Sequence, residues 1–330
     1  MIQFKQSEVT IDQIDFSDRS YIFTYDPRLA PLITSIKQIG IVNPPVLEQK
    51  SEASYRIVAG LKRILALKQL KENKLRATIY YSETGEPDYR IFLFVLYENL
   101  GTRALNVIEK ANVIYKLVHR YQISKEIIIK EFFPLLELGE NPQVLDRYLN
   151  LVALEDYLKL SILEDFISID MALLMQNLSP PERQVIFQFF QELKLGKNQQ
   201  KEFFRLLQDL SESNKQPVQT ILGDEAIKNI LSDERSTPGQ KINKIKERLL
   251  KLRYPRFSKT EDAFRQLKRE LKLPPSISFQ SPPFFEGNNY RMDFSFKNVR
   301  DFEKILKILN SIAEKHKLEK LETLVESHAL

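Results

Sequence analysis

The stretch YRIVAGLKRILALKQL, residues 55–70, changes its apolar period at its centre. Residues 55–59 read as a β-strand, whereas the apolar residues from Leu61 onward recur at helical spacing. Gly60 lies at the change, and Lys62 and Arg63 follow it. A helix that begins after a glycine directs free backbone N–H groups and the positive end of its dipole toward an anion. The stretch therefore predicts an anion site; a turn followed by a solvated helix is the alternative.

The composition is that of a soluble globular protein with more than one domain. The chain has 330 residues, of which 43% are hydrophobic and 28% charged. It has no cysteine, which excludes disulfides, thiolate chemistry and cysteine-based zinc sites. The three histidines (His119, His316, His328) lack metal-ligand spacing, and no apolar run reaches the roughly 20 residues of a membrane span. We expect a cytoplasmic protein with no membrane partner.

The first hundred residues alternate between strand-like and helix-like segments, which predicts a small α/β domain over residues 1–104. Gly40 is a natural C-cap for the first predicted helix, and Pro44 and Pro45 suit the start of a strand. The predicted helices cover residues 29–39, 61–71 and 88–97, and the predicted strands cover 44–48, 55–59 and 76–81.

The middle of the chain, residues 105–235, is predicted to be a helical domain. Apolar residues recur every three to four positions in eight segments, namely 106–121, 124–136, 142–153, 155–163, 168–177, 180–193, 197–211 and 216–231. The sequence SDERSTPG, residues 232–239, is the best candidate for a linker.

Residues 236–330 predict a C-terminal module of two basic helices followed by a β-hairpin and a helix. The basic helices cover 239–252 and 259–272, the strands 276–280 and 290–296, and the last helix 298–315. A hairpin and one helix make a small core, so we expect this module to pack on the helical region or on a second copy of the chain. The overall prediction is an α+β, predominantly helical fold.

Positive charge is concentrated late in the chain. Residues 240–272 carry twelve Lys and Arg against four acids, whereas the whole chain has a net charge of +5. Such a segment is suited to sequence-independent contact with phosphates; a solvated pair of charged helices is the alternative. The cations that we expect to contact DNA are Lys241, Lys244, Arg248, Lys251, Arg253, Arg256, Lys268 and Arg269.

Three blocks of the N-terminal region together resemble one known family. They are LITSIKQIGIVNPPVL (residues 32–47), IVAGLKRILALKQL (57–70) and ENLGTRALNVIEKA (98–111). In this order they resemble the N-terminal domain of ParB-type partition proteins, a fold shared with sulfiredoxin. The resemblance covers about residues 10–110 and extends more loosely to about 210. Sulfiredoxin chemistry needs a cysteine, which this chain lacks.

The resemblance implies a site for CTP with Mg²⁺. It assigns nucleotide-binding roles to Gly40, Asn43, Pro44, Gly60, Lys62, Arg63, Thr102 and Arg103, and catalytic and metal-binding roles to Glu98 and Asn99. The chain departs from the family pattern GERR, since Leu61 replaces the acid and Lys62 the first arginine. In the third block, Thr102 takes the place of the family's arginine and Arg103 follows one position later.

The same resemblance implies a helix-turn-helix near residues 124–154. Its first helix would cover 124–136, its turn 138–142 and its second helix 143–154. Gln143, Arg147 and Asn150 lie on the polar face of the second helix and are of types that reach base edges or phosphates. A helical domain that only packs is the alternative.

These features predict a ParB-like protein that binds DNA and CTP, forms a homodimer and associates with the nucleoid. Its expected role is chromosome or plasmid partition or a related DNA-associated process, with a possible partner ATPase. Two alternatives remain open. One is a slow nucleotide triphosphatase, in effect a weak CTPase, in which Glu98 orients water. The other is a degenerate adaptor that recruits a protein partner.

Overall fold

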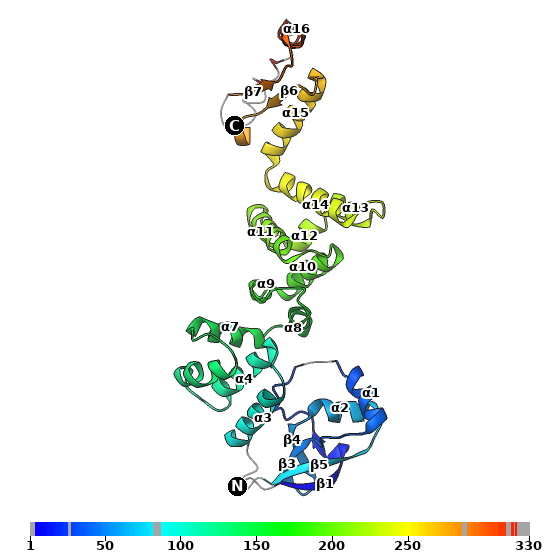
Figure 1. Ribbon diagram of the computed structural model, residues 1–330, viewed down its shortest axis with the longest axis vertical. Coiled ribbons are helices and arrows are strands. Elements are labelled where there is room, and N and C mark those ends of the chain that lie inside the picture. The colour runs from blue at the N-terminus through cyan, green and yellow to red at the C-terminus, as the bar shows by residue number, and fades with distance from the viewer. Residues whose placement is uncertain are drawn as a thin grey trace. The chain divides into compact units, whose positions relative to one another are not determined.

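The computed structural model describes residues 4–25, 28–81, 87–285, 289–314, 318–319 and 321. The chain divides into two compact units, Met1–Gln176 and Asn177–Leu330 (Figure 1). The first unit contains a small mixed sheet followed by helices, and the second is helical apart from one two-stranded sheet. The predicted α+β, predominantly helical class is confirmed.

A five-stranded sheet forms the base of the first unit. Its strands are β1 (Phe4–Thr10), β2 (Ile14–Asp15), β3 (Val46–Ser51), β4 (Ser54–Ala59) and β5 (Lys74–Tyr81), in the spatial order β1-β5-β3-β4-β2. β3 pairs parallel to β5 and antiparallel to β4. The sheet is therefore mixed, and both strands that lead into the candidate site, β3 and β4, lie inside it rather than at an edge.

Helices cover both faces of this sheet. On one face, α1 (Ala30–Ile39) and α2 (Leu61–Gln69) pack through Ile36 and Ile64 onto Leu47 and Ile57 of β3 and β4. On the other face, α3 (Tyr89–Thr102) contributes a cluster that includes Val58 of β4. β4 is thus enclosed on both sides, which explains why its last four residues are all buried.

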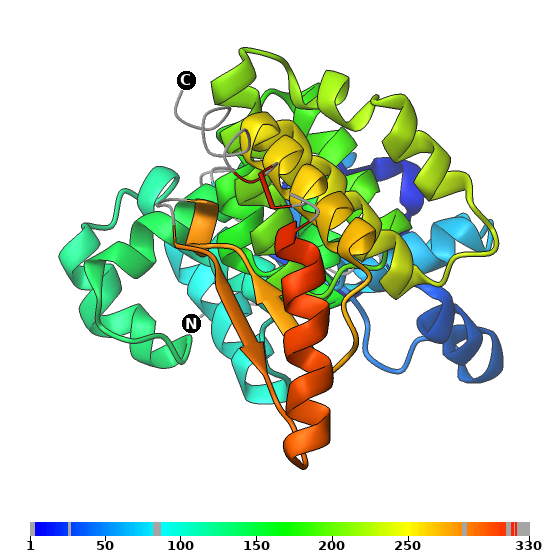
Figure 2. The ribbon, with the colours of Figure 1, turned by 90° about the horizontal axis from the view of Figure 1, so that it is seen from above.

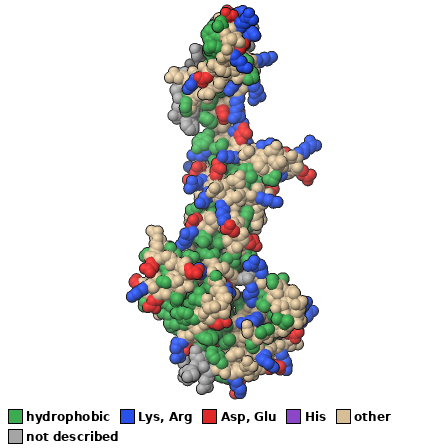
Figure 3. All heavy atoms as spheres, viewed as in Figure 1, with side chains coloured by type: hydrophobic (Ala, Val, Ile, Leu, Met, Phe, Trp, Pro, Cys, Tyr) green, Lys and Arg blue, Asp and Glu red, His purple; other side chains and the backbone are tan. Residues whose placement is uncertain are grey.

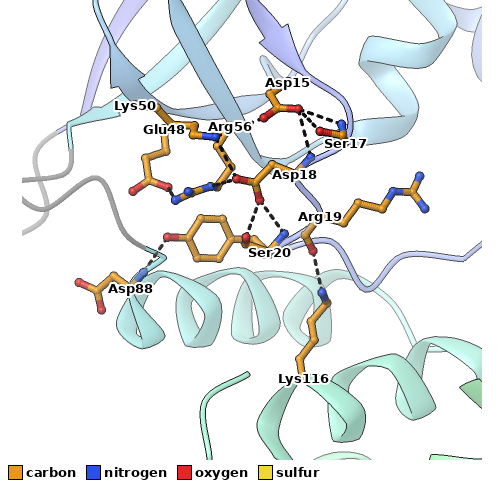
Figure 4. A network of polar contacts seen from close by, with 11 residues as sticks. Asp15, Ser17, Asp18, Arg19, Ser20, Glu48, Lys50, Arg56, Asp88 and Lys116 are labelled. Atoms are coloured by element: carbon orange, nitrogen blue, oxygen red, sulfur yellow. Dashed lines mark hydrogen bonds and ion pairs between the residues drawn. The ribbon is translucent and has the colours of Figure 1, made fainter. Parts of the chain in front are cut away.

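A polar network holds the segment after β2 against the sheet (Figure 4). The Arg56 side chain, only 5% exposed, donates to the carboxylates of Glu48 and Asp18. Asp18 also accepts from Lys50 and from the backbone and hydroxyl of Ser20. A buried arginine needs such partners because an unpaired buried charge is strongly unfavourable. The network therefore fixes residues 15–20 beside β3 and β4.

Six α-helical segments and one π-helical turn follow α3 in the first unit, which also contains the short 3-10 helix η1 (Ile11–Gln13) between β1 and β2. The segments are α4 (Val107–His119), α5 (Lys125–Ile127), α6 (Phe133–Leu135), α7 (Pro142–Val152), α8 (Asp156–Leu163) and α9 (Ile169–Met175), and η2 (Ile128–Phe132) is the π-helical turn between α5 and α6. Pro134 follows the turn and has no N–H to donate. The predicted helix 124–136 is therefore present, but its central turn is π-helical and not α-helical.

The second unit begins with α10 (Pro180–Glu192), α11 (Lys197–Asn214), α12 (Val218–Leu222) and α13 (Glu225–Ser232). The predicted helix 216–231 was wrong as a single element, because Gly223 and Asp224 separate α12 from α13. The Asp224 carboxylate accepts from the backbone N–H of Ile227 and so caps α13.

The C-terminal module contains α14 (Pro238–Arg253), α15 (Pro255–Leu271), β6 (Ile277–Gln280), β7 (Arg291–Phe294) and α16 (Val299–Glu314). The antiparallel strands β6 and β7 run beside α16 (Figure 2). Phe264 of α15 packs on Phe279 of β6 and on Tyr290, with Ile312 of α16 in the same cluster. Phe279 and Phe285 are buried in this cluster, whereas Phe294 and Phe296 are exposed.

Several element boundaries differ from the predictions. β1 and β2 were missed, α3 extends five residues beyond the predicted end at 97, and α15 begins four residues before 259. Leu100 packs on the cluster beneath α3, which explains the longer helix. The same cluster contains Val58 and Leu117 and so crosses the predicted domain boundary after residue 104. None of the helices in the described part of the chain has the length and apolar character that a membrane span requires.

Candidate functional site

One wall of the candidate site is the loop between α1 and β3. The helix α1 ends at Ile39, and Gly40 has φ +68°, a left-handed conformation that glycine adopts without strain. Pro44 and Pro45 then lead into β3. Ile39 and Val42 are 68% and 71% exposed, so this loop presents apolar surface beside the Asn43 side chain.

The second wall is the start of α2, where the sequence predicted an anion site. β4 ends at Ala59, Gly60 takes φ +89°, and α2 begins at Leu61. The start of α2 directs the positive end of the helix dipole toward the space before it, while the Arg63 N–H donates to the Gly60 carbonyl at 2.9 Å. Lys62 and Arg63 are half-buried there, while Leu61 is buried in the core.

Two adjoining cavities bring these walls together with α3. The larger has a volume of about 590 Å³ and is lined by the loop, including Gly40, Asn43 and Pro44. The smaller, of about 380 Å³, is lined by Gly60 and Lys62. The residues that line both are Leu32, Ala59, Arg63, Glu98 and Thr102. The three sequence blocks therefore do converge on one concave region.

The α3 side of the site differs from the prediction in its details. Glu98 and Asn99 lie inside α3 rather than at its end, because the helix continues to Thr102. The Asn99 amide donates to the Val95 carbonyl and to Glu98, and its Oδ1 accepts from Arg103. The Thr102 hydroxyl donates to the carbonyl oxygens of Glu98 and Asn99. Of these side chains, Glu98 is the one with an exposed carboxylate facing both cavities.

Arg103 contacts a buried acid that the sequence interpretation did not single out. Its guanidinium donates to both oxygens of Glu109, at 2.6 and 2.9 Å, and Glu109 is 1% exposed. Glu109 also accepts from the backbone N–H groups of Tyr25 and Asn106. Asn106 lies three residues before Glu109, and this capping-box spacing was the available signal. Arg103 thus ties α3 to α4.

The donor set at the site can contribute to Mg²⁺ binding but does not enclose the ion. No group of three or more His, Cys, Asp or Glu side chains within the described residues could hold a metal. Mg²⁺ is commonly bound by one or two carboxylates together with substrate phosphates. The exposed Glu98 carboxylate fits that role, whereas the amide group of Asn99 is already hydrogen-bonded on both atoms.

The predicted DNA-reading helix is present as α7, which packs on α4. Gln143 and Asn150 are exposed on it, as a reading face requires. Arg147 forms an ion pair with Asp170 at 2.7 Å. Base contacts by these residues remain a prediction, with Gln143 and Asn150 the more accessible of the three.

Many cations of the basic segment are engaged within the second unit. Arg248 forms a bidentate pair with Asp224 at 2.7 and 3.1 Å, and Lys251 contacts Asp262 at 2.9 Å. Lys244 contacts Ser236 and Asp233, and Lys241 donates to the Leu231 carbonyl. These contacts stabilise the joints between α13, α14 and α15.

A smaller group of cations is free of such pairs. Arg256, Lys268 and Arg269 are exposed and make no ion pair with any residue that the structure describes. Arg253 lies against the ring of Tyr254 at 5.0 Å. Figure 3 shows Lys and Arg side chains on the surface of the C-terminal module. Arg256, Lys268 and Arg269, which we call the α15 trio, are thus the most accessible of the predicted phosphate ligands.

Comparison with known proteins finds similarity in the N-terminal region. Residues 3–91 match the model of the ParB N-terminal domain. The N-terminal part of this chain is therefore ParB-like.

Two curated relatives are similar to this chain over a longer stretch than the matched domain. The chain is 27% identical over 129 residues to the nucleoid occlusion protein of Lysinibacillus sphaericus (strain C3-41), and 28% identical over 129 residues to that of Bacillus cytotoxicus (strain DSM 22905 / CIP 110041 / 391-98 / NVH 391-98). Each match covers 39% of this chain, and 40% and 41% of the two relatives. The likeness is thus to less than half of either protein.

Two solved structures are similar at lower identity. C-terminally truncated ParB of Caulobacter crescentus complexed with CTP-gamma-S is 18% identical with a TM-score of 0.26, and the match covers 54% of this chain and 94% of that one. The same protein complexed to the centromeric parS site is 15% identical with a TM-score of 0.31, covering 60% and 98%.

Proposed function

We propose that this chain is a DNA-associated, ParB-like protein whose N-terminal unit binds a nucleoside triphosphate, CTP, together with Mg²⁺. The observation that carries the proposal is the convergence of three separate segments on two adjoining cavities. Gly40 and Asn43 line the larger cavity, Gly60 and Lys62 the smaller, and Glu98 lines both. The base binds in the larger cavity and the phosphates bind at the start of α2.

The physical chemistry of each cavity supports this orientation. Exposed apolar side chains, Ile39 and Val42, suit the face of a base, and the Asn43 amide offers a donor and an acceptor to its edge. The Lys62 side chain and the positive end of the α2 dipole suit phosphate oxygens. Glu98 would hold Mg²⁺ together with the phosphates, and the ion would neutralise their remaining charge.

The DNA-associated role rests on α7 and on the basic surface of α15. Gln143 and Asn150 provide a polar helix face for base edges. The α15 trio provides accessible positive charge for phosphates. Homodimer formation, a partner ATPase and slow CTP hydrolysis remain predictions; the proposal itself requires binding only.

Calorimetry of the full chain with CTP, UTP, ATP and GTP in the presence of Mg²⁺ tests the nucleotide site. We expect saturable binding of CTP and weaker binding of the other three. Replacing Lys62 by Gln removes a charge-assisted contact worth about 1.5–3 kcal/mol, so CTP binding should weaken by about tenfold or more.

The matched control is Lys5→Gln. Lys5 is an exposed lysine of β1 outside both cavities, and its replacement changes the net charge by the same amount. Equal weakening by the two variants would indicate a general electrostatic effect instead of a site. No binding of any of the four nucleotides would overturn the proposal and favour the adaptor.

A further inference from the structure

The two cations that follow Gly60 line the cavities differently. Lys62 lines the smaller cavity, whereas Arg63 lines both. The Arg63 Nη1 group donates to the carbonyl oxygens of Asn43 and Pro44, the latter at 3.1 Å. Arg63 therefore connects the start of α2 to the loop that forms the wall of the larger cavity.

The loop itself has few backbone donors with which to hold its shape. Pro44 and Pro45 lack N–H groups, and residues 40–45 have no regular secondary structure. The loop is anchored at one end by the Gly40 N–H, which donates to Ile36, and at the other by Pro45, whose carbonyl accepts from Thr78 of β5. The Arg63 contacts lie between these anchors, at the exposed turn that carries Asn43.

The Arg63 side chain is also confined at its far end. A Cβ atom placed on Gly60 would lie 2.8 Å from Arg63 Nη2 and 2.8 Å from the Pro45 Cβ. Burial lowers the pKa of the Arg63 guanidinium, and the Glu98 carboxylate opposes that shift. The Arg63 guanidinium therefore lies between the carbonyl oxygens of Asn43 and Pro44 and the backbone of Gly60, and it forms part of the cavity wall.

We propose that Arg63 is a positioning residue that fixes the Asn43–Pro44 turn, and that it thereby sets which base the site accepts, while Lys62 and the start of α2 carry the phosphate affinity. This inference rests on the proposed function, since it assumes that a nucleotide occupies the site. It assigns different tasks to two adjacent cations of one helical turn.

The test compares Arg63→Gln with Lys62→Gln against two ligands, CTP and inorganic tripolyphosphate, both with Mg²⁺. Arg63→Gln should weaken CTP binding by about tenfold and reduce its preference over UTP and ATP, because the turn that contacts the base is released. Its binding of tripolyphosphate should change by less than about threefold. Lys62→Gln should weaken both ligands by a similar factor. Arg63→Lys keeps the charge but not the planar fork, and should show the same pattern as Arg63→Gln.

Hydrogen exchange of the ligand-free protein provides a second measurement. The amides of Gly40 and Thr78, which donate to Ile36 and Pro45 at the two ends of the loop, should exchange about tenfold faster in Arg63→Gln and at the wild-type rate in Lys62→Gln. Unchanged exchange in Arg63→Gln and Arg63→Lys would overturn the inference, as would equal loss of CTP and tripolyphosphate binding. If the wild-type protein binds neither CTP nor tripolyphosphate, the proposed function is wrong. Failure of the proposed function is thereby distinguished from failure of the inference about Arg63.

Discussion

Gly60 is the residue on which the geometry of the site depends most closely. Its φ of +89° allows β4 to turn into α2 within one residue, and its missing side chain leaves room for the Arg63 guanidinium and for Pro45. A side chain at this position would meet both a left-handed backbone and two close neighbours. The glycine therefore serves the fold and the site together.

Replacing Gly60 by Ala should destabilise the N-terminal unit. The left-handed backbone and the displaced neighbours together cost about 1–3 kcal/mol. We also expect CTP binding to be lost, because Arg63 cannot keep its contacts with Asn43 and Pro44. Urea unfolding followed by circular dichroism, with calorimetry of the folded variant, measures the two effects.

Gly101→Ala is the control for this prediction. Gly101 lies in α3, a Cβ atom there meets nothing within 4 Å, and alanine favours a helix over glycine by about 1 kcal/mol. The control should leave CTP binding intact and raise the unfolding midpoint slightly. A Gly60→Ala variant as stable as wild type would show that the space around this residue can rearrange.

Individual roles were harder to predict than the location of the site. Residues from all three sequence blocks line the two cavities. Each block spans the end of a helix or strand, where side chains can face the same cavity. The partner of Arg103 could not be inferred in the same way. Whether it contacts a phosphate or Glu109 depends on how α3 and α4 meet, which is a tertiary property.

At the scale of elements, the segment after β2 depends on the buried network around Arg56. Asp18 is its central acceptor, since it contacts Arg56, Lys50 and Ser20 (Figure 4). Burial alone raises the pKa of Asp18, but the hydrogen bonds from Ser20 and Arg56 outweigh it and hold this pKa well below its usual value. The segment is therefore attached to the sheet through an ionised carboxylate.

This attachment makes the stability of the first unit dependent on pH. A carboxylate whose pKa is depressed on folding contributes stability that is fully present above its unfolded pKa, about 3.9, and is lost as pH falls through the folded value. Asp18→Asn should therefore lower the urea midpoint at pH 7, and its difference from wild type should narrow below about pH 4.

Asp12→Asn is the control, because Asp12 is exposed and makes no ion pair with a described residue. The urea midpoint of Asp12→Asn should equal that of wild type at pH 7 and below about pH 4. A constant difference between Asp18→Asn and wild type down to pH 2 would contradict the role assigned to the ionised carboxylate.

Considered as a whole molecule, the chain shows which parts of a fold follow from local patterns. Most helices were predicted because an apolar stripe and a cap lie within each segment, as in α4 and α10. β1 was missed because four of its seven residues are exposed and only Val9 is buried, so its pairing with β5 leaves little local signal. The division into three domains remains a prediction. The hydrophobic cluster beneath α3 contains residues from both sides of the predicted boundary after residue 104.

For the whole molecule, a DNA-binding measurement tests the proposed contribution of the second unit, which carries the α15 trio. Each phosphate contact that is lost should reduce the slope of log K against log salt by about 0.9 for duplex DNA. Replacing the α15 trio, Arg256, Lys268 and Arg269, by Gln should therefore weaken binding to a random duplex and lower this slope by up to about 2.7. Fluorescence anisotropy of labelled DNA at several salt concentrations measures both.

The control replaces three cations that already have acidic partners, namely Lys244, Lys246 and Lys251. Both triple variants remove the same formal charge, so a difference between them reports accessibility rather than net charge. The slope change in the control should be less than about half of that in the α15 trio variant, because a cation paired with a carboxylate releases fewer counter-ions on binding DNA. Equal slopes for the α15 trio variant and wild type would locate the DNA contacts elsewhere, with the exposed face of α7 the next surface to mutate.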